Sequence, residues 1–253
     1  MPERRALSTT VAETTWLTPA MVRLVVTGPD LAGFAVGEFS DHYVKCRFGE
    51  TTRSYTVRDW EPGHHRLTLD FVVHGDHGVA GPWAATAKPG DPLELMGPGG
   101  GYAPSPDAAW HLLVGDEAVI PAIAASLPRI AQGVPTFVVI EIDGPEHEQP
   151  LSSPGDLELH WVHRSAAGPG EDPSLLLDAV TALSLPGPGG QAFVHGEATA
   201  VRLIRRHLLV DRGLALQSLS ATGYWKLRRT DEQWRAEKPE WKRAAEADLV
   251  RHR

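Results

Sequence analysis

Cysteine is almost absent from this chain of 253 residues, which contains only Cys46. One cysteine excludes an internal disulfide and a cysteine-based metal or iron–sulfur site. Long hydrophobic runs are also absent: no stretch of about 18 apolar residues occurs, so we expect no transmembrane helix and no membrane insertion. Residues 1–6 are followed by polar residues instead of an apolar segment, so we expect no secretory signal. These absences predict a cytoplasmic protein.

Positive charge is in the minority. The chain has 24 Lys and Arg residues against 32 Asp and Glu residues, which gives a formal net charge of −8. This balance disfavours nucleic acid as a partner. A negative protein that binds an anion needs a local basic pocket, and two groups of cations could supply one. The first group is Lys45, Arg47, Arg53 and Arg58, and the second is Arg202, Arg205, Arg206, Lys226, Arg228 and Arg229.

Several motifs of common enzyme classes are missing as well. No G-x-G-x-x-G fingerprint follows the first strand expected in the second half, which disfavours a standard Rossmann dinucleotide site. The chain also has no Walker loop, no G-x-S-x-G elbow and no H-E-x-x-H motif. His160 and His163 are three residues apart on an expected strand, so their side chains should point to opposite faces. We therefore predict no metal site.

The first hundred residues are predicted to form a small antiparallel β-barrel. Short segments of β-branched or alternating residues are separated by turns rich in Gly, Pro and Asp. Short strands at such regular spacing favour a barrel. The expected strands are 9–17, 21–27, 42–48, 53–58, 66–73 and 92–96.

Beyond a glycine- and proline-rich boundary at 97–106, strands alternate with helices. This alternation predicts a Rossmann-like parallel α/β sheet, and we place one domain at 1–104 and the other at 105–253. Ligands of such sheets lie at the carboxyl ends of the strands. The expected strands are 110–114, 135–142, 157–162, 191–195 and 214–220. The expected helices are 118–130, 175–183, 199–209 with its basic face outward, and a surface helix after residue 230.

The segment 53–56, Arg-Ser-Tyr-Thr, has the side chains that a flavin site requires. Arg53 and Tyr55 share one face of a strand because side chains alternate. The guanidinium can bind a phosphate while the phenol ring lies on the isoalloxazine. Thr56, on the other face, can offer its hydroxyl or backbone amide to the ring edge. Glycines in the run 78–83 would let backbone amides approach a pyrophosphate.

Across both halves, the chain resembles the siderophore-interacting protein family, also described as ferric-siderophore reductases, within the ferredoxin–NADP reductase superfamily. The segments that carry the resemblance are 53–58 (RSYTVR), 70–76 (DFVVHGD), 81–84 (GPWA), 89–91 (PGD), 97–100 (GPGG), 115–123 (GDEAVIPAI), 196–198 (GEA) and 223–226 (GYWK). Two departures stand out. The family often has Thr at the position of Ala118 and Arg at that of Lys226, and lysine keeps the charge but loses the bidentate fork.

The resemblance implies an FAD-binding barrel joined to a nucleotide-reductase-like domain. It implies flavin-mediated chemistry without a catalytic side chain, with NADH, NADPH or a ferredoxin as donor. Asp116 and Glu117 could contact the nucleotide or merely cap the following helix. The implied cofactor-binding residues are Arg53, Ser54, Tyr55, Thr56, Asp70, Val72, His74, Ala80, Gly81, Pro82, Trp83, Asp116, Glu117 and Trp225.

The implied substrate is a ferric siderophore, and the implied state of the protein is a monomer. Hard anionic oxygen ligands hold Fe³⁺ far better than Fe²⁺, so reduction loosens the metal. A basic pocket of Lys45, Arg47, Lys226 and Arg228 would hold the chelate. Two alternatives stay open: a flavin reductase with a non-iron acceptor, and a binding protein without catalysis.

Overall fold

The computed structural model describes residues 6–73, 78–167, 172 and 174–250. Contacts divide the chain into two units, which we describe separately. The barrel unit comprises Met1–Ala103, Pro121–Arg129 and Glu146–Leu151, and the sheet unit comprises Pro104–Ile120, Ile130–Pro145 and Ser152–Arg253. Two short segments that follow β7 (Trp110–Asp116) and β8 (Pro135–Ile142) in the sequence thus belong to the barrel unit. In the described part of the chain, no helix is both long and apolar enough to cross a membrane.

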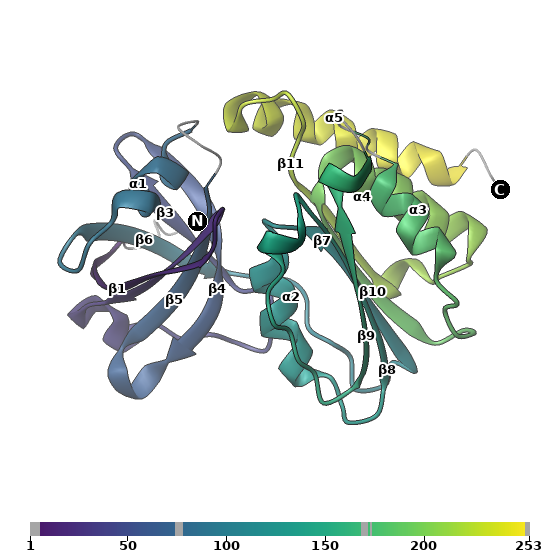
Figure 1. The fold of residues 1–253 in the computed structure, drawn as a ribbon, viewed down its shortest axis with the longest axis horizontal. Helices are drawn as coiled ribbons and strands as arrows, with labels where there is room; N and C mark the ends of the chain where they lie inside the picture. Colours follow the sequence, from purple (N-terminus) through teal and green to yellow (C-terminus); the bar gives the residue numbers. More distant parts are fainter. Residues whose placement is uncertain (1–5, 74–77, 168–171, 173, 251–253) are drawn as a thin grey trace. The chain divides into compact units, whose positions relative to one another are not determined.

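A closed antiparallel barrel forms the first unit, in the strand order β1-β2-β5-β4-β3-β6 (Figure 1). This confirms the predicted amino-terminal barrel. Hydrogen bonds along the whole ring leave the barrel without an open sheet edge. Its strands are β1 (Leu7–Thr18), β2 (Met21–Thr27), β3 (Tyr43–Phe48), β4 (Thr51–Glu61), β5 (Arg66–Val72) and β6 (Pro92–Gly99).

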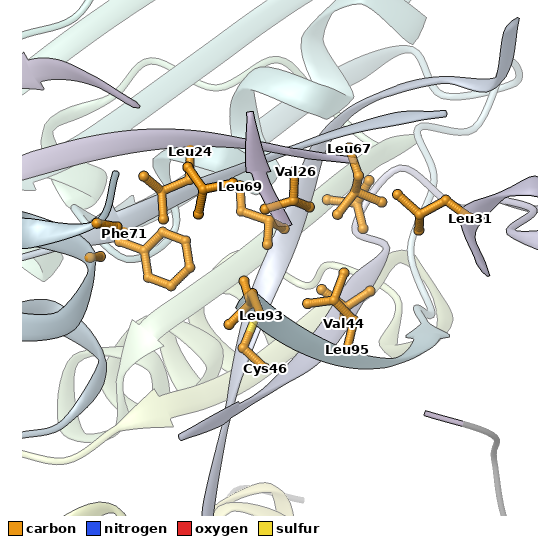
Figure 2. Packing of buried hydrophobic residues seen from close by; sticks show 14 of the residues in the cluster. Leu24, Val26, Leu31, Val44, Cys46, Leu67, Leu69, Phe71, Leu93 and Leu95 are labelled. Carbon is orange, nitrogen blue, oxygen red and sulfur yellow. The ribbon is translucent and has the colours of Figure 1, made fainter. Parts of the chain in front are cut away.

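The barrel is filled by aliphatic side chains that alternate along its strands. On β3, Val44 and Cys46 are fully buried while their neighbours are exposed. Burial raises the pKa of the Cys46 thiol, so this cysteine behaves as a small apolar residue. The short helix α1 (Ala80–Thr86) adds the buried Ala84 to the same cluster. Figure 2 shows Leu24, Val26, Leu31, Val44, Cys46, Leu67, Leu69, Phe71, Leu93 and Leu95 in this core.

The sheet unit contains a five-stranded parallel sheet in the order β11-β10-β7-β8-β9, which confirms the predicted α/β fold (Figure 1). Its middle strands are almost continuously apolar because helices cover them. The helices α3 and α4 contact each other and pack on the sheet. The elements of the sheet unit are β7 (Trp110–Asp116), β8 (Pro135–Ile142), β9 (Asp156–His163), α3 (Leu175–Ala182), β10 (Gly190–Glu197), α4 (Ala198–Arg206), β11 (Leu219–Trp225) and α5 (Asp231–Val250). The helix α2 (Ile120–Ser126) follows β7 in the sequence but belongs, from Pro121 on, to the barrel unit.

The end of the chain differs from the sequence-based expectation. The last strand, expected at 214–220, is β11 at Leu219–Trp225, and a 3₁₀ turn occupies Leu216–Ser218. The apolar residues before the turn have the sequence pattern of a strand, whereas Gly223 interrupts that pattern within the actual strand β11. A side chain at Gly223 would collide with the indole of Trp234, whose Cζ2 would lie 2.8 Å from the added Cβ. The glycine at this position is therefore required by a contact with a distant helix.

The helix α5 is not merely a surface helix, and it covers the basic side of α4. Trp234 is only 2% exposed. Arg202 forms two charged hydrogen bonds with Asp248, and Arg205 donates to the carbonyl of Ala245. The cations of α4 are therefore not simply exposed to solvent as expected: Arg202 is 39% exposed but paired with Asp248, and Arg205 is bound to the backbone of α5.

Candidate functional site

Strand β4 places Arg53 and Tyr55 on the face of the β3–β4 ladder that also carries Cys46 and Val44. Cross-strand partners in an antiparallel ladder share a face, and the register pairs Cys46 with Arg53 and Val44 with Tyr55. The Tyr55 ring lies against the buried Phe71, with ring centroids 4.0 Å apart at 35°. Both Arg53 and Tyr55 are partly exposed. Tyr55 is thus an aromatic surface fixed on the barrel core beside a guanidinium.

The expected chelate cations of β3 lie on the opposite face of that ladder. Lys45 pairs with Ser54 and Arg47 with Thr52, and Thr56 shares their face. Lys45 and the expected site residue Ser54 are exposed, whereas Thr56 is buried. Arg47 forms an ion pair with Glu94 at 3.1 Å. The structure therefore separates Lys45 and Arg47 from Arg53 and Tyr55, and brings Lys45 to the face of Thr56.

Asp70 is already bound to another residue of the barrel strands. Its two oxygens accept hydrogen bonds from Arg23 Nε at 2.7 Å and Nη2 at 2.8 Å. The pair joins β2 to β5, where Arg23 and Asp70 are register partners. Val72 ends β5, and the expected contact His74 lies outside the described residues. Asp70 is therefore a structural carboxylate whose flavin contact stays a prediction.

Arg58 is a further candidate for binding an anion. From the sequence it was predicted only as one of the first group of cations. The register of β4 against β5 shifts between Val57 and Asp59, so Arg58 is the extra residue of a bulge. Among the described residues it has no hydrogen bond or ion pair, and it is partly buried. Burial, and then the neighbouring Arg23, lower the pKa of Arg58. A guanidinium in this setting is suited to an anionic ligand.

The start of α1 offers backbone donors. Its N-cap residue is Val79, whose side chain makes no capping hydrogen bond, and the first turn contains Ala80, Gly81 and Pro82. Free amides at a helix start are ready to bind a phosphate. Trp83 packs on Phe48 and Phe71, with centroid distances of 5.3 and 6.2 Å, and thereby fixes α1 on the barrel. A partly exposed aromatic ring, a guanidinium and the amides at the start of α1 together fit a flavin nucleotide.

In the sheet unit, Asp116 ties three strands together at their carboxyl ends. Its Oδ1 accepts from the amide of Ala118 at 2.9 Å. Its Oδ2 accepts from the amide of Glu197 and from Trp225 Nε1, both at 2.8 Å. Asp116 is 4% exposed, and burial, followed by the charge of Glu117, raises its pKa to about 7. This carboxyl group therefore holds the turn before α2 and positions the partly exposed Trp225.

Glu117 is likewise held by protein partners that the sequence did not reveal. Arg164 binds both oxygens of Glu117 and donates to Glu141 at 3.4 Å. Glu117 also accepts from the amide of Asp143 at 3.0 Å. No local pattern pairs Glu117 with a residue 47 positions away. The nucleotide contact expected for Glu117 stays a prediction.

Lys226 and Arg228 belong to a tight turn, residues 226–229, which we call the basic turn. The amide of Arg229 donates to the Lys226 carbonyl at 3.1 Å, and Arg228 has a left-handed φ of 59°. Lys226 and Arg229 both bind Glu237 of α5. The basic turn lies in the sheet unit, whereas Lys45 and Arg47 lie in the barrel unit. Each unit thus carries part of the expected cationic set.

The buried Asp116 predicts a pH dependence of stability. In the unfolded chain its pKa is near 3.8, and in the folded protein it is about 7. Between these values the folded state binds the extra proton, so stability falls as pH rises and levels off above the folded pKa. Relative to Asp116→Asn, the wild type should lose about 2 kcal/mol of unfolding free energy from pH 5 to pH 7.5. Urea unfolding of both proteins at the two pH values measures this loss. A difference in unfolding free energy that stays the same at both pH values would contradict the prediction.

The combination of this barrel with this parallel sheet defines a ferredoxin–NADP reductase-like fold. The ferredoxin NADP⁺ reductase from Neisseria gonorrhoeae matches with a TM-score of 0.66, covering 88% of this chain and 100% of that chain. The two sequences are 16% identical, so this likeness shows the fold alone.

The family follows from the sequence matches. Residues 49–102 match the siderophore-interacting FAD-binding domain, and residues 108–228 match the siderophore-interacting protein model. Protein Rv2895c of Mycobacterium tuberculosis is 37% identical in an alignment of length 278 that covers 96% of this chain and 96% of Rv2895c. Ferric vibriobactin reductase ViuB of Vibrio cholerae is 30% identical over 243 residues, covering 86% of this chain and 88% of ViuB. A siderophore utilization protein from T. fusca has a TM-score of 0.80 at 33% identity, covering 90% of this chain and 95% of that chain. The chain belongs to the siderophore-interacting protein family.

Proposed function

We propose that the chain is an FAD-dependent ferric-siderophore reductase. It would reduce chelated Fe³⁺ to Fe²⁺ in the cytoplasm so that the siderophore releases the iron, with NADH, NADPH or a ferredoxin as electron donor. The observation that carries the proposal is the pairing of Arg53 with Tyr55 on one face of β4, inside the region that matches the FAD-binding domain. The similarity to ferric vibriobactin reductase ViuB supports the choice of substrate.

The barrel residues would hold the cofactor in distinct ways. Arg53 and the amides at the start of α1 would bind the phosphates, and Tyr55 would lie against the isoalloxazine. The packing of Tyr55 on Phe71 fixes that ring before the flavin binds, so little side-chain entropy is lost on binding. When bound, FAD supplies an acceptor for the two electrons of a hydride and a donor of single electrons to a metal.

The sheet-unit residues would bind and orient the substrate. Lys226 and Arg228 of the basic turn would attract an anionic chelate. In the barrel unit, we propose the same role for Lys45 and Arg47. Asp116 would keep the indole of Trp225 in place through its hydrogen bond to Nε1. No side chain needs to coordinate the iron, because the siderophore already supplies its ligands and reduction weakens their hold on the metal.

An anaerobic experiment tests this function. The FAD-loaded protein is reduced with NADH or NADPH and then mixed with a ferric siderophore, while flavin absorbance and capture of Fe²⁺ by a ferrous-specific chelator are followed. We expect oxidised flavin to return together with Fe²⁺. The gallium(III) complex of the same siderophore is the matched control, since it has the same charge but accepts no electron.

The other outcomes separate the rival functions. Oxidation by free flavin or a quinone, but not by the ferric siderophore, would identify a flavin reductase with a non-iron acceptor. Binding of the ferric siderophore without reoxidation of the flavin would identify a binding protein without catalysis.

A further inference from the structure

One carboxylate of the protein already occupies the basic turn. Glu237 of α5 accepts a hydrogen bond from Lys226 Nζ at 2.7 Å through Oε2. Its other oxygen, Oε1, accepts from Arg229 Nε at 2.5 Å. Each oxygen thus serves one cation, as a carboxylate of a bound ligand would. The hydrogen bonds from Lys226, and then from Arg229, lower the pKa of Glu237, so it is ionised at neutral pH.

The backbone of the basic turn does not depend on Glu237. The turn is closed by its own hydrogen bond from the amide of Arg229 to the Lys226 carbonyl, at 3.1 Å. The amide of Leu227 donates to Glu197 at 3.2 Å, which anchors the turn to the start of α4. The cations should therefore keep their positions when Glu237 is neutral.

Solvent reaches the ion pairs. The side chains of Lys226, Glu237 and Arg229 are 31%, 33% and 40% exposed. Exposed pairs of this kind contribute little to stability, because water and salt screen them and both side chains lose freedom. A ligand with several negative charges can therefore compete with a single carboxylate for the same donors.

We propose that Glu237 is an internal competitor at the chelate site: it binds Lys226 and Arg229 in the free protein, and the anionic groups of an iron chelate must displace it. This inference rests on the proposed function and identifies the residue that limits affinity for anionic chelates. When the chelate leaves, Glu237 binds the cations again and favours its release. An uncharged chelate would not need to displace Glu237 from these cations.

The test compares Glu237→Gln with Asp248→Asn, a matched control. Asp248 is also on α5 and also binds an arginine through both oxygens, but its partner Arg202 lies on α4. Binding of a trianionic ferric tris-catecholate and of an uncharged ferric tris-hydroxamate is measured by tryptophan fluorescence, with oxidised FAD and without an electron donor. Thermal unfolding verifies that both variants are folded.

Glu237→Gln should bind the trianionic chelate about fivefold more tightly than the wild type, because one nearby negative charge is removed and two cations are released. The gain should shrink as salt is raised and should be smaller in the Lys226→Gln/Glu237→Gln double variant. The uncharged chelate should bind the variant and the wild type equally, and Asp248→Asn should change neither affinity.

Two failures are distinguishable. Unchanged or weaker binding of the trianionic chelate by Glu237→Gln, in a protein that still binds and reduces ferric chelates, would overturn the role of Glu237 alone. A wild-type protein that binds neither chelate would overturn the proposed function and this inference together.

Discussion

Replacing Arg53 by alanine should weaken FAD binding about 50-fold, which corresponds to about 2.3 kcal/mol for a lost charge-assisted contact to phosphate. Arg53 sits beside Tyr55 on β4, where the guanidinium can reach a phosphate while the phenol ring contacts the flavin. The affinity is measured by titrating the apoprotein with FAD and following flavin fluorescence. Riboflavin, which has no phosphate, should bind the variant and the wild type equally.

A second arginine of the barrel provides the control for Arg53. Arg66 on β5 forms an ion pair with Glu13 at 2.6 Å, outside the expected flavin site. Arg66→Ala removes the same charge from the same unit and should leave FAD affinity unchanged. Equal losses in the two variants would mean that Arg53 acts only through the overall charge, and no loss in Arg53→Ala would remove it from the site.

Truncation of Trp234 to alanine should destabilise the protein by about 3 kcal/mol, in the range for a buried tryptophan. Its ring is 2% exposed and meets Trp241 edge to face, with centroids 5.8 Å apart. The ammonium groups of Lys226 and Lys238 lie 6.0 and 5.8 Å from its centroid. The variant should therefore lose area burial, an aromatic contact and two cation–π contacts.

Urea unfolding followed by circular dichroism measures this loss. Trp16 is 47% exposed, so Trp16→Ala serves as the matched control and should change stability by less than about 0.5 kcal/mol. If Trp234→Ala and the wild type had the same urea midpoint of unfolding, α5 would not be part of the core of the sheet unit.

The barrel and the parallel sheet could be predicted from the sequence because their signals are local. Alternation of apolar and polar residues marks β3, and the apolar runs of β7 and β8 mark buried parallel strands. The shared face of the two residues proposed for the flavin could be predicted for the same reason. Arg53 and Tyr55 share a face by the alternation of a single strand, and the register with β3 confirms that geometry.

The terminal region could not be predicted, because its pattern depends on contacts between distant residues. Gly223 breaks the apolar alternation of β11, and its role appears only when Trp234 is seen beside it. The cations of α4 look solvent-exposed in sequence until Asp248 is placed next to Arg202. Propensity and periodicity do not report such pairings, since they describe neighbours along the chain.

The sequence by itself determined the class of fold, the order of the strands along the chain and the side chains of the flavin motif, since each follows from local periodicity or a short motif. Only the tertiary structure decided which charged side chains are already paired within the protein. It assigned Asp70 to Arg23, Glu117 to Arg164 and Glu237 to the basic turn. The physical reason is that an ion pair depends on a distance of a few ångströms in space, which the separation of two residues along the chain does not fix.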